Sequence, residues 1–314
     1  MTTPKDIITK YPFLKTNDAE NIIMGDDIDA ALSCFLYLSQ NPNAKLVGIY
    51  HQYKKIYFNA TIVSKKELGN CIYIDLDIYH QKCRSLGHHI VRLNKENKLQ
   101  GFQNSCNLNE LKGFSIENNF TKKFPLGTIH FLLWLYQIDI PSTNWAKYLI
   151  WLADSTFING QNHRFPKNVI TWINLFPVPA LVESFAELDT EIFEEKMEEL
   201  QQILSQKNFE QGEGQVKSKH KQLTGFQCQP KKNANAEELS VYIQKIFQMI
   251  EEMTNWQIKP EQICVEDMEY FSFKRKTEKI ENVLKDTNLD DFLIKNKVFS
   301  YVFPFKDSIN YTHF

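Results

Sequence analysis

The chain lacks the features that mark several broad classes of protein. Its six cysteines form no C-x-x-C pair, which disfavours both a zinc ribbon and a dense disulfide framework. We therefore expect free thiols in a reducing compartment, the cytoplasm. The first residues contain no apolar run of the kind found in signal peptides. The most apolar segment, 129–138, is shorter than the roughly 18–20 residues that span a bilayer, so we expect no membrane segment.

Charge and aromatic content exclude further classes. The chain has 314 residues, with 36 Lys and Arg against 38 Asp and Glu, which gives a formal net charge of -2. This balance provides no overall basic signal of nucleic-acid binding, although a local basic groove is compatible with it. The 23 Phe and 13 Tyr argue against wholesale disorder. The length suits one large domain or two of ordinary size.

The sequence does contain an alternation of apolar runs with helical patterns. Residues 22–24, 46–50, 55–59 and 71–77 are typical of strands, and residues 29–40 have the spacing of an amphipathic helix. Strands and helices in alternation predict βαβ units, and therefore an α/β fold with a parallel doubly wound sheet. Ligands of such sheets bind beyond the carboxyl ends of the strands.

The chain divides into two predicted domains with a connection between them. We predict a metal-binding catalytic domain over 1–180 and a smaller α/β domain for substrate or partner over 237–314. A long acidic helix over 181–206 and a flexible basic linker over 207–236 would join them.

Further elements are expected inside both domains. In the first domain, 129–136 predicts a buried helix, whereas 148–157 suits either a strand or a helix. For the second domain the patterns predict helices at 238–253 and 276–284 and strands at 262–265, 270–273 and 298–305.

Acidic and histidine side chains follow several of the predicted strands. Asp27 and Asp29 come after the first strand, Asp75 ends a later strand, and Asp154 ends another apolar segment. Each group also suits a plainer role: an aspartate before a helix is often only an N-cap, and a histidine pair such as the one that begins at His88 is often packing or a solvated turn. Hard divalent cations bind carboxylate oxygens, and imidazole suits Mn²⁺. Together these groups would suit a pair of Mn²⁺ or Mg²⁺ ions.

The order of these groups resembles the motif order of the DHH phosphoesterase superfamily, over roughly residues 20–160. That superfamily has an Asp-x-Asp after its first strand, an Asp at the end of a later strand, an Asp-His-His, and an Asp followed by Ser or Thr. Its members include single-strand exonucleases, phosphodiesterases of short oligonucleotides and of cyclic dinucleotides, and manganese pyrophosphatases. The resemblance implies a DHH-like fold and a hydrolase with two metal ions.

The resemblance also assigns roles to single residues. The Asp-x-Asp pair corresponds to Asp27 and Asp29, and the strand-end aspartate, which bridges two ions in the family, corresponds to Asp75. His88 takes the place of a metal ligand, and His89 takes the place of a group that stabilises the phosphate. The implied metal ligands are Asp27, Asp29, Asp75, His88 and Asp154, and the implied catalytic residues are Asp75 and His89.

The fourth motif and two departures complete the comparison with the superfamily. Asp154 is followed by Ser155 and Thr156, as the fourth motif requires. The third motif has Gly87 where the family has its aspartate, and Ile23 stands where some members have a metal-binding histidine. These two departures favour the alternative that the protein resembles the family but has lost catalytic activity.

We therefore predict a divalent-metal-dependent phosphoesterase that hydrolyses phosphodiester bonds of a nucleic acid, or of an oligo- or cyclic nucleotide, by means of a metal-activated hydroxide. Lys54, Lys55, Arg92 and Arg164 are candidate phosphate-binding cations, although each one alone is better explained as a surface charge. The alternative is a catalytically impaired DHH-like protein that binds nucleotide or nucleic acid, or a subunit of a complex. A homodimer is compatible with either, and the sequence does not choose the substrate.

Overall fold

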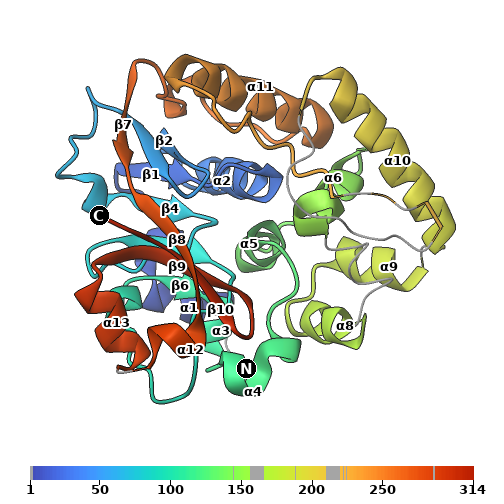
Figure 1. Ribbon diagram of the computed structural model, residues 1–314. Helices are drawn as coiled ribbons and strands as arrows, with labels where there is room; N and C mark the ends of the chain where they lie inside the picture. The colour runs from blue at the N-terminus through green and yellow to red at the C-terminus, as the bar shows by residue number, and fades with distance from the viewer. Residues whose placement is uncertain are drawn as a thin grey trace.

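The computed structural model describes residues 3–143, 145–155, 166–187, 189–209, 220–221, 223, 225–285 and 287–314. At its centre lies a seven-stranded sheet, the main sheet, which Figure 1 shows beside a group of helices. Its strands are β1 (Glu20–Met24), β2 (Ala44–His51), β3 (Lys55–Asn59), β4 (Ile72–Ile74), β5 (Arg84–Gly87), β6 (Cys106–Asn107) and β7 (Met268–Ser272).

Most of the main sheet is parallel. The strand order is β6-β5-β4-β1-β2-β3-β7. The pairs from β6 to β2 are parallel, whereas β3 runs antiparallel to both β2 and β7. The predicted α/β fold with a mostly parallel sheet is confirmed. None of the helices in the described part of the chain combines the length and apolarity needed to cross a bilayer.

Helices cover one face of the main sheet. They include α2 (Ile28–Gln40), α5 (Thr128–Tyr136) and α11 (Ala236–Thr254), which share one apolar cluster with the strands. Phe35 of α2 meets Phe247 of α11 edge-on, with ring centroids 5.3 Å apart, an arrangement that aromatic rings favour. The apolar run at 129–136 is the buried helix α5, as its sequence predicts.

The opposite face differs from the predicted doubly wound arrangement. Among the described residues, the apolar cluster on this face contains no α-helical side chain. Instead Phe273 and Phe299 stack with ring centroids 4.5 Å apart and pack against Tyr50 and Tyr73 of the main sheet. Phe299 belongs to a second sheet, in the order β8-β10-β9, so aromatic side chains of a sheet take the place of a helical layer. The second sheet consists of β8 (Lys274–Lys279), β9 (Val298–Phe305) and β10 (Ser308–His313).

The predicted long helix over 181–206 is wrong, because the chain breaks it at Asp189. The helix α9 (Pro179–Glu187) ends before that residue, and α10 (Thr190–Gln206) begins after it. The Asp189 carboxylate accepts hydrogen bonds from the backbone N–H groups of Glu191 (2.9 Å) and Ile192 (3.1 Å), so it is the N-cap of a new helix. Figure 1 places these helices with α6 (Ala146–Leu152) and α8 (Pro166–Leu175) on one side of the molecule.

The C-terminal part of the chain contributes to both sheets. The helix predicted at 238–253 is α11, and the strand predicted at 270–273 is β7 of the main sheet. Only the stretch from β8 onward builds the second sheet, so the sheets do not divide at the predicted domain boundary at residue 237. The strand predicted at 298–305 is confirmed as β9.

Two predicted elements in this part are wrong. Residues 276–279 are predicted as helix but belong to β8. Their charged residues favour helices in sequence, whereas in the structure they lie on an exposed edge strand. A short helix, α12 (Ile280–Val283), follows. Residues 262–265, predicted as a strand, contribute only a single bridge, from Ile263 to Leu46. The described residues also include the α-helices α1 (Pro4–Lys10), α3 (Leu108–Leu111), α4 (Ile116–Asn119) and α13 (Leu289–Lys295).

Close approach of β2 to β3 requires a glycine at position 48. A Cβ there would lie 2.2 Å from the Tyr57 carbonyl oxygen, which is backbone and cannot rotate away. We expect Gly48→Ala to lower the free energy of unfolding by about 1–3 kcal/mol through overpacking, measured by urea denaturation. Gly69→Ala is the matched control, because its nearest neighbour is a His80 ring atom at an ordinary 3.5 Å. Equal stability of the two variants would contradict this account.

Candidate metal centre

The acidic groups predicted from the sequence gather where β1 and β4 end. β1 lies between β2, which follows it in the chain, and the later strand β4; such switch points in parallel sheets form ligand-binding crevices. The backbone N–H of Gly25 donates to the Ile74 carbonyl oxygen at 3.1 Å and holds the two strand ends together. Asp75 has a φ of 59°, so the chain turns there, and β4 is shorter than the strand predicted to reach residue 77.

Asp29 is the most deeply buried of these acids. Its side chain has no exposed surface, and its carboxylate accepts hydrogen bonds from the backbone N–H groups of Thr128 (2.7 Å) and Ile129 (2.9 Å). These groups form the first turn of α5, whose partial positive charge favours an anion. A Cβ at Gly127 would lie 2.6 Å from an Asp29 carboxylate oxygen. The residue that opens α5 must therefore be glycine.

His88 links the carboxylates that surround it. Its Nδ1 lies 3.1 Å from Oδ1 of Asp75 and 2.9 Å from Oγ1 of Thr128, and its Nε2 lies 2.9 Å from Oδ2 of Asp154. The Thr128 hydroxyl donates to Oδ1 of Asp75 at 2.7 Å. The Asp75–Thr128–His88 network therefore fixes the orientation of the imidazole.

The structure brings donor atoms together from three predicted ligands. One ligand atom each of Asp29, His88 and Asp154 lies within 4.8 Å of the other two, so this cluster could hold a metal ion. Asp75 adjoins the cluster through His88. Asp154 reaches it from the turn after α6, where its φ of 53° aims the chain back toward the strand ends. The apolar segment before Asp154 is therefore a helix, one of the two options left open by its sequence.

Several negatively charged carboxylates are crowded together in the cluster, and this shifts the pKa values of its residues. Burial, followed by the charges of Asp75 and Asp154, raises the pKa of Asp29 well above its ordinary value. Burial is also the main reason that the pKa of Asp75 rises to about 7. Burial alone would lower the pKa of His88, but the carboxylates of Asp154 and Asp75 outweigh it and raise this pKa well above 6.5. A cation would relieve this repulsion.

Asp27 has two roles in the structure. Its Oδ1 accepts a hydrogen bond from the Ala30 backbone N–H at 3.0 Å, so it is the N-cap of α2, as the plainer interpretation of the sequence has it. Its pKa is nevertheless raised well above the ordinary value, by burial and then by the charges of Asp154 and Asp29. Asp27 therefore lies beside the cluster, although it is not one of the three residues whose donor atoms converge.

Sequence reasoning overlooked Asp77, which holds His89. Oδ2 of Asp77 accepts from both the backbone N–H (3.1 Å) and Nδ1 (3.1 Å) of His89, and its Oδ1 accepts from Nδ2 of Asn107 at 2.6 Å. A Cβ at Gly87 would lie only 2.2 Å from that Oδ1. The carboxylate of Asp77, which ends the same apolar run as Asp75, thus occupies the space that a side chain at position 87 would need.

A second overlooked pair consists of Asp26 and His51. Oδ2 of Asp26 lies 2.8 Å from Nδ1 of His51 and accepts from the Gln52 backbone N–H at 2.8 Å. Asp26 is therefore a structural anchor for the turn after β2. The position of His51 at the carboxyl end of β2 is the same sequence signal that identified Asp75.

The candidate phosphate-binding cations fall in different surroundings. Arg92 donates hydrogen bonds to both carboxylate oxygens of Glu110 (3.2 and 2.7 Å) and to the Asn97 carbonyl oxygen. Its guanidinium therefore has a structural role, which competes with phosphate binding. Arg164 lies outside the described residues. Lys54 and Lys55 follow the turn after β2 and line a pocket with His51.

The segment from 225 to 235, predicted to be flexible linker, packs against the centre. Phe226 and Cys228 are buried, the Gln227 carbonyl accepts from the Ile28 N–H at 2.8 Å, and the Gln227 side chain accepts from the Asp154 N–H at 3.2 Å. The flexible-linker prediction is wrong for this segment, because its buried apolar side chains and the hydrogen bonds of Gln227 hold it against the centre. Residues 210–219, which include Lys217 and Lys219 of the predicted basic linker, lie outside the described residues.

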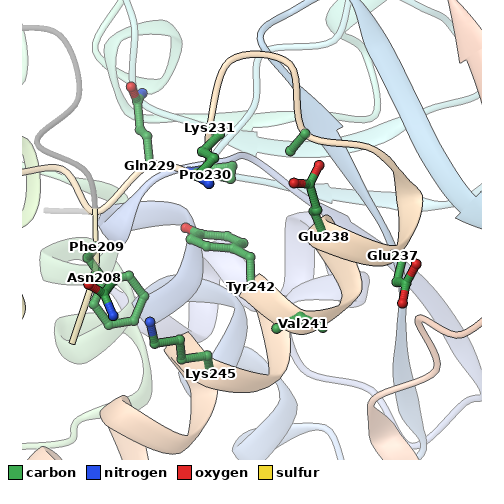
Figure 2. A pocket seen from close by; sticks show the side chains of 11 residues that line it. Asn208, Phe209, Gln229, Pro230, Lys231, Glu237, Glu238, Val241, Tyr242 and Lys245 are labelled. Atoms are coloured by element: carbon green, nitrogen blue, oxygen red, sulfur yellow. The ribbon is translucent and has the colours of Figure 1, made fainter.

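Two cavities lie beside the segments described so far. One, of about 520 Å³, lies between this segment and α11, where Figure 2 shows Tyr242 projecting toward Pro230 with Lys245 and Glu238 nearby. The other, of about 170 Å³, lies between the turn after β2 and the second sheet, and His89, Tyr53, Arg275 and Asn310 are among the residues that line it. Only the second contains a predicted catalytic residue.

Two side chains make this smaller cavity suitable for an anionic ligand. The Arg275 guanidinium lies 5.8 Å from the Tyr53 ring centroid, and Nη1 of Arg275 donates to the Gln52 carbonyl at 3.4 Å. Burial, followed by the charges of Asp75 and Asp27, raises the pKa of Tyr53 well above its ordinary value. Its hydroxyl therefore stays protonated and can donate a hydrogen bond beside the acidic cluster.

Comparisons of the chain with protein-family models, with curated proteins and with solved structures find no match. The interpretation of the centre therefore depends on its own geometry.

The raised pKa of Asp75 predicts a pH-dependent stability in metal-free protein. An acid whose pKa rises on folding holds its proton more tightly when folded, so raising the pH between the two pKa values favours unfolding. Because the pKa of Asp75 rises from 3.8 to about 7, we expect stability in EDTA to fall as the pH rises across that interval. Asp75→Asn cannot ionise and should recover roughly 1–4 kcal/mol at the upper end, measured by urea unfolding.

The control for this experiment is Asp18→Asn, which changes an exposed carboxyl in the loop before β1. It should retain the wild-type profile of stability against pH. If Asp75→Asn showed the same profile as the control, the carboxyl of Asp75 would not be the strained group that we describe.

Proposed function

We propose that the protein is a divalent-metal-dependent phosphoesterase, acting on phosphodiester bonds of a nucleic acid or a nucleotide. The convergence of Asp29, His88 and Asp154 carries this proposal, because their donor atoms lie within 4.8 Å of one another at the carboxyl edge of the sheet. Carboxylate oxygens with one imidazole form a donor set that suits Mn²⁺, and Mg²⁺ less well. Asp75 and Asp27 adjoin this set and supply ligands for a second ion.

The buried carboxylates support a cation rather than a purely structural network. Three aspartates, Asp27, Asp29 and Asp75, have pKa values raised by burial and mutual repulsion. Such an arrangement destabilises the protein in the absence of positive charge, and strained titratable clusters of this kind concentrate at functional sites. Bound divalent ions would activate a water molecule and offset charge on a phosphoryl group.

The chain's own residues orient the reacting groups. Asp75 and Thr128 fix the imidazole of His88, as second partners of metal-binding histidines do. Asp77 accepts from Nδ1 of His89, which leaves Nε2 on the far side of the ring to donate to a phosphate oxygen when the ring is protonated. Arg275, in the same cavity as His89, supplies a guanidinium that pairs well with phosphate.

A second candidate function is binding without turnover. His88 already joins Asp75 and Asp154, and Asp29 is satisfied by the first turn of α5, so these hydrogen bonds hold the centre together by themselves. A relative that retained such a network could bind nucleotide or nucleic acid and hydrolyse nothing. Activity measurements with Mn²⁺ separate this alternative from the first.

Metal binding gives the first test. Mn²⁺ at about 100 times its Kd should stabilise the protein by about 2.7 kcal/mol, seen as a rise in Tm, and should support hydrolysis within a panel of phosphodiesters. Asp154→Ala removes a converging ligand whose side chain is 33% exposed, so the fold should survive. We expect it to lose the Mn²⁺-dependent rise in Tm and to lower kcat/KM by more than about 10²-fold, since even partners behind the ligands contribute 10–100-fold.

The control is again Asp18→Asn, which should keep both the Tm response and the activity. If Mn²⁺ raised Tm and nucleotides bound but no phosphodiester were cleaved, the binding function would replace the catalytic one. If Mn²⁺ and Mg²⁺ left Tm unchanged, the metal centre itself would be ruled out.

Asp77 gives a test of the His89 assignment. Asp77→Asn weakens the hydrogen bond that orients His89 while leaving the three converging ligands in place, so we expect kcat to fall by about 10–100-fold with KM little changed. The Mn²⁺-dependent rise in Tm should persist, measured by the same thermal titration. A loss of the metal response without a fall in kcat at saturating Mn²⁺ would show that Asp77 supports the metal instead of the histidine.

A further inference from the structure

A basic, aromatic pocket lies beside the turn between β2 and β3, outside the metal centre. Its volume is about 660 Å³, within the roughly 300–1,000 Å³ of small-molecule sites. The residues that line it come from the turn itself, from β7 and from the segment that leads into α11. None of the metal ligands proposed above lines it.

Two tyrosines form one wall of this pocket. Tyr57 of β3 and Tyr270 of β7 are directly paired across the strands, with ring centroids 5.6 Å apart and planes inclined by 43°. Tyr57 is buried, and its hydroxyl donates to the Ala234 carbonyl at 3.3 Å. Tyr270, in contrast, is 59% exposed. An exposed tyrosine ring beside a buried one, on the edge strand of a sheet, can serve as a stacking platform for a planar ligand.

The charged side chains around the platform are all of one sign. Lys54, Lys55 and Lys232 line the pocket, and no carboxylate does; Nζ of Lys55 lies 4.6 Å from the Tyr270 ring centroid. This concentration of positive charge stands out in a chain whose formal net charge is -2. The cavity in Figure 2 differs, because Glu237 and Glu238 line it together with its lysines. Of these two cavities, the tyrosine pocket is the one that places an exposed tyrosine ring beside Lys54 and Lys55.

The turn that carries the lysines is held in an uncommon conformation. Gln52 and Tyr53 both have positive φ (57° and 51°), and the Lys54 N–H donates to the His51 carbonyl at 3.0 Å. Positive φ angles usually belong to Gly or Asn, and bulky residues in this conformation persist where the surroundings enforce it, often at functional sites. Here the hydrogen bond from the Gln52 N–H to Asp26 enforces it.

This conformation places the two sides of the turn in different pockets. Tyr53 lines the cavity that contains His89, while Lys54 and Lys55 line the tyrosine pocket. The two cavities are therefore neighbours separated by a single turn of the backbone.

We propose that the tyrosine pocket binds an unpaired nucleotide, with its base against the Tyr270 ring and its phosphate at Lys54 and Lys55. The base would stack because every nucleobase has a planar face, and the lysines would hold the phosphate electrostatically. The nucleotide has two possible sources: a free mononucleotide, or one unit of a single strand. The inference goes beyond the proposed function, since it requires neither metal nor turnover.

Binding measured in EDTA tests this proposal separately from catalysis. The probes are a fluorescein-labelled oligothymidylate of about ten nucleotides, within the usual site sizes of single-strand binding proteins, and unlabelled AMP and UMP as competitors. Tyr270→Ala should weaken binding of the strand by about 5–150-fold, the equivalent of 1–3 kcal/mol per stacked base. Tyr270→Phe keeps the ring and should bind as wild type.

Two further measurements identify the contacts. Replacing both Lys54 and Lys55 by Gln removes the contact with this one phosphate and should reduce the slope of log K against log salt by about 0.7, the value for each phosphate contact with a single strand. Phe305→Ala removes a 68% exposed aromatic side chain from β9 and should change nothing, which makes it the matched control. Thermal melting of each variant reports whether it is folded.

The competitors decide the source of the nucleotide. Displacement of the strand by AMP or UMP at millimolar levels indicates a mononucleotide site, whereas displacement only by unlabelled oligothymidylate indicates that the strand itself is bound; both support the proposal. Folded Tyr270→Ala protein that binds as tightly as wild type would overturn it. So would failure of the wild-type protein to bind the strand and both mononucleotides, whatever the outcome of the hydrolysis assays.

Discussion

The crowding of buried carboxylates at the ends of β1 and β4 is the constraint on which the rest of the structure depends. Asp29 and Asp75 would repel each other strongly in a site that excludes water, and the chain counters this with two sources of positive potential. One is the first turn of α5, whose backbone N–H groups bind both oxygens of Asp29. The other is His88, which lies between Asp75 and Asp154. The orientation of α5 against the main sheet follows from the need to point its N-terminus at Asp29.

Glycine is required at two positions where a carboxylate lies close to the backbone. The Asp29 carboxylate occupies the space that a Cβ of Gly127 would fill, and the Asp77 carboxylate occupies that of Gly87. These two glycines are thus explained by neighbouring charges and not by backbone flexibility. The second case also changes the meaning of a departure from the DHH pattern. Gly87 leaves room for the carboxylate of Asp77, which follows β4 in the chain, so a carboxylate lies beside the histidine pair although position 87 itself carries none.

The sequence predicted the strand ends better than the contacts made there. Apolar runs that end in acid placed Asp29, Asp75 and Asp154 in one region, because carboxyl ends of parallel strands share an edge. The hydrogen bond from Thr128 to Asp75 could not be predicted in this way, because the two residues are 53 positions apart and Thr128 opens a helix instead of ending a strand. Arg92 appeared available for phosphate because its partner Glu110 is 18 residues away. The charged strand β8 was mistaken for a helix because Lys and Glu favour helices and its pairing partner β10 lies far along the chain.

The turn between β2 and β3 links the acidic centre to the basic pocket, and this proximity has an electrostatic consequence. A cluster of buried carboxylates repels a phosphate group until cations intervene, so a centre of this kind needs positive charge on the route of approach. Under the proposed function, Lys54 and Lys55 would provide it on one side of the turn and Arg275 on the other. Asp26 fixes the turn that separates them, since its carboxylate binds both Gln52 and His51. Asp26 therefore determines where these positive charges lie relative to the acidic ones.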